Sequence, residues 1–330
     1  MKRNFRTSIF IILTILLSGG IVYSQTISWQ LTTMKLRNNR SIAVASNGDI
    51  WTVASDEVYS YSGEVYLSTD NGDTWVIKNN GLSGKVYSIA INPANGYIFV
   101  AKCNDKWDGG LFRSSNRGET WVNVTNDMDD INGTNFNIFI TVSGAIYLVI
   151  KGKIYYSSNN GGTWIRKKNN GLPYEATLLA LGKDGTLYAK GKDGRGIYRS
   201  TNRGDNWLTP SSKVKDVIFH SITFSEDGSI FAATFEGILK STDKGVTWIK
   251  VGNKPASQII YNLVTKDIFL YAHWTSEVYM STNLGASWEF ERKIGDFRFV
   301  VCNPNTGQIY LVTSDGVYRS KNYPEQRGNN

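Results

Sequence analysis

The chain has few of the residues on which common enzyme chemistry depends. It holds two histidines among 330 residues, and it contains no His-Glu-x-x-His, no Gly-x-Ser-x-Gly and no phosphate-binding loop. Its two cysteines, Cys103 and Cys302, lie far apart in the sequence. An oxidising compartment would permit a disulfide, but nothing in the sequence brings the two together, so we expect separate thiols. The sequence predicts no metal site and no cofactor.

A clustered basic stripe is also missing. The formal net charge is +8 at pH 7, but lysine and arginine are scattered along the chain. Nucleic-acid binding depends on basic residues gathered on one face, so we expect no nucleic-acid partner. Aromatic residues, at 13%, are abundant instead, and tryptophan and tyrosine suit both sheet packing and ligand contact.

The N-terminus has the pattern of a secretory signal. Three basic residues within the first six precede an apolar run at 8–17, which is too short to span about 30 Å of hydrocarbon. Residues 22–24 fit a cleavage site, so we expect a signal peptide at 1–24 and a secreted or periplasmic mature chain of net charge +5, with an uncleaved anchor as the alternative. No cysteine lies near the cleavage site, which argues against a lipid-anchored lipoprotein. No other segment is apolar enough to cross a membrane.

One eight-residue pattern returns throughout the mature chain. It first reads STDNGDTW and then recurs five times with small changes. The tryptophans of successive copies are 46, 43, 43, 41 and 40 residues apart. A period in the forties indicates an array of repeated supersecondary units. The six copies occupy residues 68–75, 114–121, 157–164, 200–207, 241–248 and 281–288.

Each repeat predicts four short antiparallel strands. In the repeat at 85–124, alternating or β-branched runs at 87–91, 97–101, 110–114 and 120–124 are separated by turn residues. Gly-containing turns join the first two strands in five other repeats, and such turns tolerate positive φ. No segment of the mature chain shows a sustained helical period. The fold class is therefore all-β, a β-propeller built from four-stranded antiparallel blades.

The number of blades follows from the two ends of the chain. Seven third strands can be counted, the last at 317–319, but no eight-residue pattern follows that strand. The segment around Trp29 resembles a fourth strand and precedes Trp75 by 46 residues. We therefore predict seven blades over residues 25–322, closed by the N-terminal strand completing the last blade, and a tail at 323–330.

The repeated pattern has a structural interpretation as turn chemistry. An Asp or Asn side chain can bond backbone N–H groups two residues on, the glycine supplies a conformation that a Cβ would penalise, and the tryptophan packs between blades while its N–H finds a carbonyl. A calcium site is the alternative, but Asn replaces Asp in four copies and no distant Glu completes a calcium loop. The structural residues are Asp70, Gly72, Trp75, Asn116, Gly118, Trp121, Asn159, Gly161, Trp164, Asn202, Gly204, Trp207, Asp243, Gly245, Trp248, Asn283, Gly285 and Trp288.

This pattern resembles the Asp-box of the BNR-repeat proteins. That superfamily includes sialidases, sortilin-type receptors, xyloglucan-active hydrolases and the photosystem II assembly-factor propellers, and the resemblance covers residues 25–322. It implies that the turns lie on the face opposite the usual binding site. Length and blade number fit the single-propeller assembly-factor type best. Activity does not follow, because one fold supports many functions.

Candidate functional residues lie where a repeat departs from its siblings. The longest loops between second and third strands are at 56–61 and 104–108, and the longest connection between blades is at 126–133. Long loops are tolerated at functional positions. These three insertions belong to neighbouring blades, so we expect them to cluster on one side of the ring. The predicted ligand-binding residues are Tyr59, Tyr61, Trp107, Asp127 and Trp274.

Two enzymatic functions are alternatives to binding. A glycosidase needs two carboxylates across a sugar, and the weak catalytic candidates are Asp105, Asp108, Asp129 and Asp130. A sialidase would resemble its family further through an Arg-Ile-Pro motif and an arginine triad. The chain has no Arg-Ile-Pro, and Arg113, Arg199 and Arg319 share one repeat position that favours a structural role. His220 is expected to be packed, and Arg40, His220 and Arg298 near the central channel are the next candidates.

The sequence as a whole favours a secreted binding or scaffold propeller. We expect a monomer that recognises a protein or glycan partner on the face opposite the Asp-boxes. A glycoside hydrolase that uses the acidic cluster in the loops of the first three blades is the alternative.

Overall fold

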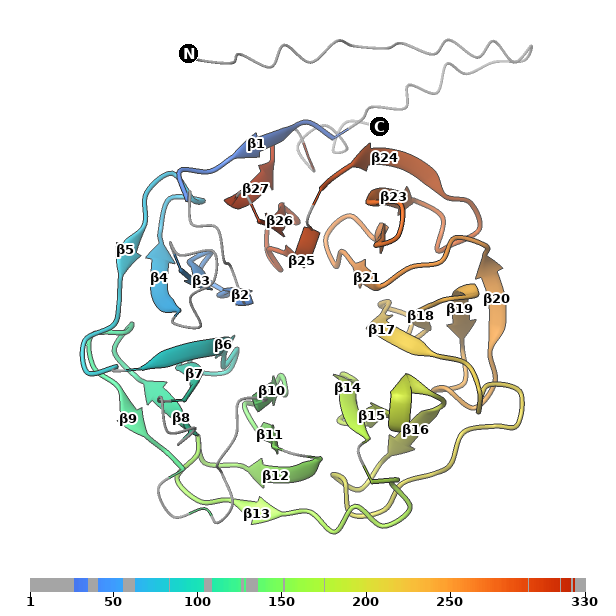
Figure 1. Ribbon diagram of the computed structural model, residues 1–330, viewed down its shortest axis with the longest axis horizontal. Coiled ribbons are helices and arrows are strands. Elements are labelled where there is room, and N and C mark those ends of the chain that lie inside the picture. The colour runs from blue at the N-terminus through green and yellow to red at the C-terminus, as the bar shows by residue number, and fades with distance from the viewer. Residues whose placement is uncertain are drawn as a thin grey trace.

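The computed structural model describes residues 27–34, 41–55, 63–82, 84–103, 109–125, 128, 136–150, 152–174, 176–295, 297–314, 316–321 and 323. These residues form seven antiparallel sheets arranged as a ring around a central axis (Figure 1). Almost no helix is present in this part of the chain, where a short 3-10 turn, η1 (Lys192–Gly194), is the exception. The predicted seven-bladed β-propeller is confirmed.

Within each blade the strands run in chain order from the central channel outward, apart from the strand that closes the last blade. Blade 1 holds β2 (Ser41–Val44), β3 (Ile50–Ala54), β4 (Glu64–Ser68) and β5 (Val76–Ile77); blade 2 holds β6 (Lys85–Ile91), β7 (Ile98–Cys103), β8 (Gly109–Ser114) and β9 (Val122–Asn123); blade 3 holds β10 (Phe136–Ile140), β11 (Ile146–Ile150), β12 (Lys153–Ser157) and β13 (Ile165–Arg166); blade 4 holds β14 (Thr177–Leu181), β15 (Leu187–Lys190) and β16 (Ile197–Ser200). Blade 5 holds β17 (Phe219–Phe224), β18 (Ile230–Thr234), β19 (Gly237–Ser241) and β20 (Ile249–Gly252); blade 6 holds β21 (Gln258–Tyr261), β22 (Ile268–Ala272), β23 (Glu277–Ser281) and β24 (Glu289–Lys293); blade 7 holds β25 (Phe297–Cys302), β26 (Ile309–Thr313), β27 (Gly316–Ser320) and β1 (Trp29–Leu31).

The second strands carry the densest apolar sequence because each is covered on both faces. All five residues of β3, β11, β18, β22 and β26 are buried. Seven apolar clusters form the core, and each lies between two neighbouring blades. Blade-to-blade burial, rather than one central core, therefore stabilises the ring.

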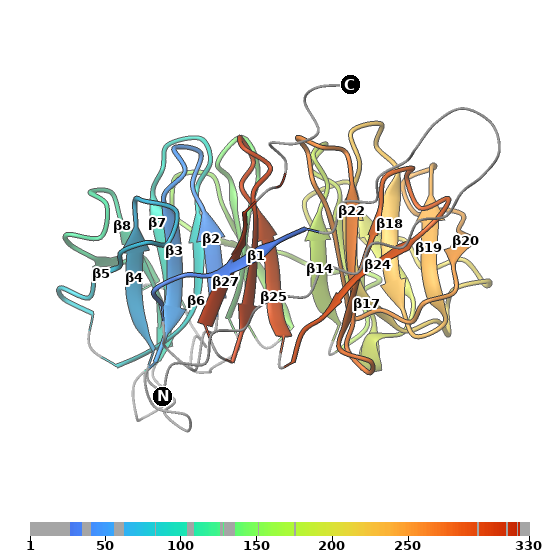
Figure 2. The same cartoon turned by 90° about the horizontal axis from the view of Figure 1, so that it is seen from above.

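Blade 7 is completed by the N-terminus, as predicted. Strand β1 pairs antiparallel with β27, with Trp29 opposite Ser320. The flanking residues of this N-terminal strap (residues 27–34) extend the contact, because Ile27 is buried between blades 6 and 7 and Met34 between blades 7 and 1. In Figure 2 the strap crosses the outside of blade 7. The pairing covers the strand edge that an open ring would expose.

The C-terminal end contributes to the same junction. Tyr323 is buried, packs edge-on against Phe269 with ring centroids 5.6 Å apart, and donates a hydrogen bond to the carboxylate of Asp267. The propeller therefore includes Tyr323, the residue at which the tail was predicted to begin.

Blade 4 departs from the four-stranded plan. Its fourth strand is reduced to one bridge, in which Leu208 and Arg199 exchange backbone hydrogen bonds of 2.8 and 3.3 Å. Pro210 occupies the position from which blades 1 to 3 donate a further backbone N–H to the third strand, as from Lys78 to Val65 at 2.8 Å, and proline has no N–H to donate. A Cβ on Gly196 would lie 2.7 Å from the Pro210 Cγ, so the proline ring covers this edge.

The eight-residue turn has the same geometry in all six copies. In the first copy, the Ser68 hydroxyl accepts the N–H of Gly72 at 2.7 Å, and Asp70 Oδ1 accepts the N–H of Thr74 at 2.8 Å. The acceptor thus bonds the backbone four residues on, not two as predicted, because the chain makes a wider turn through two consecutive left-handed residues, Asn71 (φ 58°) and Gly72 (φ 92°).

An asparagine performs the same role as the aspartate in four copies. Asn116 Oδ1 accepts the N–H of Thr120 at 3.0 Å, while its Nδ2 donates to the Thr120 hydroxyl at 2.8 Å. In the aspartate copies the hydroxyl donates to the carboxylate instead, at 2.5 Å from Thr74 to Asp70. The threonine hydroxyl can donate to an aspartate or accept from an asparagine, so rotating its hydrogen lets either residue hold the same turn.

The repeated tryptophans act as spacers between blades. Trp29 and the six turn tryptophans each pack against a different one of the seven apolar clusters. The predicted N–H bond to a carbonyl is present in five of the six turns, and two of the five reach the preceding blade, from Trp121 to Lys78 and from Trp164 to Val124. The Nε1 atoms of Trp29 and Trp288 are buried without a partner.

The two cysteines lie on different blades. Cys103 ends β7 in blade 2, and Cys302 ends β25 in blade 7. Cys302 is a free thiol, as expected, and burial raises its pKa to about 12. A thiol with so high a pKa is a poor nucleophile.

Candidate functional site

The antiparallel order divides the propeller into two unlike faces. Turns that join third to fourth strands, together with the hairpins between first and second strands, lie on one face. Loops that join second to third strands lie on the other, with the connections between blades. This second face is called the loop face below. The eight-residue turns and the loop face are therefore on opposite sides of the ring, as the strand directions require.

Most predicted site residues lie outside the described residues. This applies to the ligand-binding candidates Tyr59, Tyr61, Trp107 and Asp127, to the next candidate Arg40, and to all four catalytic candidates, which are Asp105, Asp108, Asp129 and Asp130. Trp274, His220 and Arg298 are described. Arg298 lies on β25, where its backbone carbonyl accepts a hydrogen bond from Gln258.

Trp274 belongs to an aromatic group that spans two blades. It lies in the loop between β22 and β23 of blade 6, with half of its surface (50%) exposed. Its ring centroid is 4.5 Å from that of Phe235, in the loop between β18 and β19 of blade 5, and 5.8 Å from that of His220, near the start of β17. We call His220, Phe235 and Trp274 the aromatic corner. Blades 5 and 6 supply it jointly on the loop face.

The three rings are tilted against one another rather than coplanar. His220 meets Phe235 edge-on, at 4.4 Å and 79°, and Phe235 meets Trp274 at 43°. Such tilted contacts are favourable for aromatic pairs. Phe235 nevertheless keeps 44% of its surface exposed, so the corner presents apolar area to solvent.

An aromatic row continues from the corner toward blade 7. His273 is exposed and lies 6.2 Å from Trp274 and 6.1 Å from Tyr271 between ring centroids. Tyr271 in turn stacks on Phe297 at 3.9 Å. Since Tyr271 and Phe297 are buried, they form the base of the row rather than its surface. The exposed part remains the corner and His273.

His220 is packed, as its position at the start of a first strand suggested. Its Nε2 atom is buried and has no hydrogen-bond partner. Burial lowers the pKa of His220, and the positive charge of Lys190 lowers it further. The ring is therefore neutral at pH 7, which suits an apolar aromatic contact.

Lys190 supplies the positive charge that acts on His220. It ends β15 in blade 4, on the loop face, and burial lowers its pKa. Within the described residues, no ion pair or hydrogen bond is recorded for its ammonium group. Glu236, next to Phe235 on the same loop, is exposed and pairs with neither Lys190 nor His220. Among the described residues, the positive charge of Lys190 beside the aromatic corner thus has no paired anion.

The sequence singled out Trp274 as a candidate, but it did not single out Phe235 or Lys190. Most candidates lie in the longest predicted loops, whereas Phe235 lies in a two-residue loop between Thr234 and Gly237. A signal was available, because tight turns favour small polar residues, so that a phenylalanine there is unusual. Lys190 had no comparable signal, since a lysine at a strand end is ordinary.

Arg113, Arg199 and Arg319 have the structural role that their shared position predicted. Each donates a hydrogen bond to a backbone carbonyl in the eight-residue turn of the next blade. In every case this is the left-handed residue that precedes the turn glycine. The contacts therefore join successive blades on the face opposite the aromatic corner.

Within the described residues, no group of three or more His, Cys, Asp or Glu side chains could hold a metal ion. In the same part of the chain, no helix has the length and apolar character needed to cross a membrane.

Comparison with known proteins agrees with the fold and leaves the family open. No protein-family model matches the chain. Over 244 residues it is 26% identical to a xyloglucanase from Paenibacillus sp, in a match covering 58% of this chain and 24% of that protein. The chain spans about a quarter of the length of the curated relatives it matches.

Solved structures provide longer but more distant matches. YCF48 from Cyanidioschyzon merolae superimposes with a TM-score of 0.66 at 13% identity, covering 88% of this chain and 98% of that one. YCF48 bound to D1 peptide gives a TM-score of 0.69 at 13% identity, covering 91% and 98%. At such identities the likeness shows a shared propeller fold.

Proposed function

We propose that this protein is a secreted or periplasmic binding propeller, which holds a protein or glycan partner on its loop face. The observation that supports this most is the aromatic corner. Large apolar rings exposed side by side on one face are typical of interaction sites, and aromatic residues dominate interface energetics. We further infer that the eight-residue turns are Asp-boxes with a structural role, because their polar groups are engaged in holding the turn.

One comparison supports a binding role without defining the ligand. YCF48, a propeller of similar extent, has been seen bound to a peptide. The other predicted ligand-binding residues, Tyr59, Tyr61, Trp107 and Asp127, lie outside the described residues. These four residues remain predictions.

The test is a binding screen with matched variants. The mature protein is applied to glycan and peptide arrays beside Trp274→Ala and Phe235→Ala. Loss of a buried aromatic anchor typically costs about 2 kcal/mol or more, so either variant should weaken binding of an identified ligand about 30-fold. Phe290→Ala is the control, because Phe290 is similarly exposed (52%) but lies on the outer strand β24.

The outcomes separate the hypotheses clearly. If the corner variants bind as the intact protein does, the binding face lies elsewhere, and Trp107→Ala tests the loops of blades 1 to 3. If Phe290→Ala weakens binding equally, the outer strands rather than the loop face carry the interaction.

A glycoside hydrolase is the second candidate, favoured by the sequence similarity to a xyloglucanase. Retaining and inverting glycosidases both need paired carboxylates, and the candidates predicted from the sequence are Asp105, Asp108, Asp129 and Asp130. Release of reducing ends from xyloglucan is the assay. If two of these aspartates form the catalytic pair, replacing either one by asparagine should abolish turnover and leave glycan binding intact. Absence of turnover by the intact mature protein would remove this candidate.

A further inference from the structure

We propose that the aromatic corner and Lys190 together bind an acidic peptide segment, in which an apolar side chain packs on Phe235 and Trp274 and a neighbouring carboxylate pairs with the Lys190 ammonium. This inference rests on the proposed function and specifies the chemistry of the partner. Three blades supply the site, since Lys190 comes from blade 4, Phe235 from blade 5 and Trp274 from blade 6.

The charge at the site selects for an anion. Lys190 is half-buried, and the described residues offer it no carboxylate. A desolvated ammonium without a counter-ion is unfavourable, so a ligand carboxylate that reaches it gains more than it would on an exposed lysine. A Cβ on Gly194 would lie 3.9 Å from the Lys190 Cδ and 3.6 Å from the backbone oxygen of Phe219, the residue before His220. The Lys190 side chain therefore lies at the start of β17, beside the corner. A cationic ligand would be repelled from the same place.

The ring geometry favours a peptide over a polysaccharide. A sugar chain stacks on flat, exposed ring faces, but the three rings of the corner are tilted by 43° to 79° and pack edge against face. The exposed area is therefore a small apolar surface formed by the two rings of Phe235 and Trp274, which meet at an angle. One branched or aromatic side chain can pack on such a surface, and a peptide can carry a carboxylate on the adjacent residue.

Three fluorescein-labelled octapeptides provide the probe. One alternates Asp with Phe, and the others replace every Asp with Asn or with Lys. Fluorescence anisotropy with the intact mature protein should show the acidic peptide binding at least 10-fold more tightly than the neutral one, with the basic peptide weakest. The advantage of the acidic peptide should shrink as salt rises, because the pairing is electrostatic.

Variants then separate the two parts of the site. Lys190→Gln should abolish the difference between the acidic and neutral peptides, whereas Trp274→Ala should weaken both about 30-fold. Lys250→Gln is the matched control, because Lys250 is exposed on the outer strand β20 of blade 5. It should leave all three affinities unchanged.

The two histidines of the chain allow an independent readout by NMR, with His220→Gln assigning the signals. Replacing Lys190 with glutamine removes a positive charge, so the pKa of His220 should rise. Binding of the acidic peptide should raise it too, since the carboxylate neutralises the same charge. This measurement also reports whether Lys190→Gln has kept the fold.

Each contrary outcome has a distinct meaning. Equal affinity for the acidic and neutral peptides, or a charge preference that survives Lys190→Gln, overturns the role of Lys190 while a binding function of the corner stands. If no peptide binds but a glycan binds in a Trp274-dependent manner, the occupant proposed here is wrong and the binding function is right. If no ligand depends on Trp274 or Phe235, both are wrong.

Discussion

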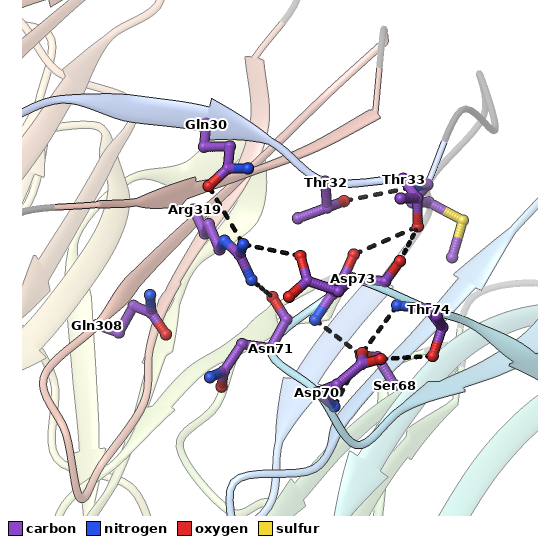
Figure 3. A network of polar contacts seen from close by, with 12 residues as sticks. Gln30, Thr32, Thr33, Ser68, Asp70, Asn71, Asp73, Thr74, Gln308 and Arg319 are labelled. Atoms are coloured by element: carbon purple, nitrogen blue, oxygen red, sulfur yellow. Dashed lines mark hydrogen bonds and ion pairs between the residues drawn. The ribbon is translucent and has the colours of Figure 1, made fainter.

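The Arg319 guanidinium donates a hydrogen bond of 2.9 Å to the backbone carbonyl of Asn71, although 248 residues separate them in sequence (Figure 3). Its other nitrogen lies 2.7 Å from Asp73 Oδ1 and donates to Gln30 Oε1 at 3.2 Å. Arg319 therefore joins the last blade, the first blade and the N-terminal strap. Joining the two ends of the ring costs chain entropy, and the hydrogen bonds and ion pair of Arg319 offset part of that cost.

Replacing Arg319 by alanine should destabilise the protein by about 1.5–3 kcal/mol, the range for hydrogen bonds to charged groups. Chemical denaturation measures the change in the free energy of unfolding. Arg199→Ala is the matched control, since Arg199 makes the corresponding contact to Lys244 at 3.4 Å on an exposed surface. A loss no larger than that of the control would show that Arg319 has no special role in closure.

The N-terminal strap should contribute stability through Ile27 more than through its exposed residues. Ile27 is buried between blades 6 and 7, and removal of such a side chain typically costs 2–5 kcal/mol, in order-of-magnitude terms. Ile27→Ala should therefore lower the melting temperature clearly. Leu31→Ala, on the same strap but with 42% of its surface exposed, should have little effect. Equal melting temperatures for Ile27→Ala and the intact protein would count against ring closure by the strap.

Backbone conformation and close packing can be separated with two glycines. Gly118 and Gly228 have nearly equal φ values of 78° and 82°. A Cβ on Gly118 would lie 2.9 Å from the Lys78 Cβ and 3.1 Å from the buried ring of Trp51, whereas a Cβ on Gly228 would meet nothing within 4 Å. Gly228→Ala should cost about 1 kcal/mol and Gly118→Ala about 2–4 kcal/mol in unfolding free energy. Similar costs would indicate that the turn shifts to accommodate the methyl group.

Acid should weaken the aspartate copies of the turn and spare the asparagine copies. Hydrogen bonds from Thr74 lower the pKa of Asp70 from 3.8 to about 2, and Thr247 does the same for Asp243. Because the folded-state pKa is depressed, the stabilisation is complete above about pH 4 and is lost as the pH falls toward 2.

The double variant Asp70→Asn/Asp243→Asn tests this directly. At pH 7 its melting temperature should match that of the intact protein, since asparagine makes the same turn in four other copies. Between pH 4 and pH 2 its melting temperature should fall less steeply. A loss of calcium-dependent stability in this variant would show that the turn binds metal after all.

The sequence by itself determined the blade and the number of blades. Alternating strands such as 87–91 and 97–101, and turns such as the one that ends at Trp75, are encoded by residues close together in the chain. They therefore appear nearly unchanged in β6 (Lys85–Ile91) and β7 (Ile98–Cys103). Even the closing strand was readable, because Trp29 kept the spacing of the repeat. The sequence predicted a full outer strand in blade 4, and its reduction to one bridge was not predicted, although Pro210 explains it.

Only the tertiary structure decided which side chains share the loop face. His220, Phe235 and Trp274 are 15 and 39 residues apart, and no periodicity in the sequence relates them to Lys190. They meet because the angle between neighbouring blades brings the start of β17, two loops and the end of β15 to one place. Local patterns encode strands and turns through short-range sterics and hydrogen bonds, whereas a site built from three blades depends on long-range packing between them.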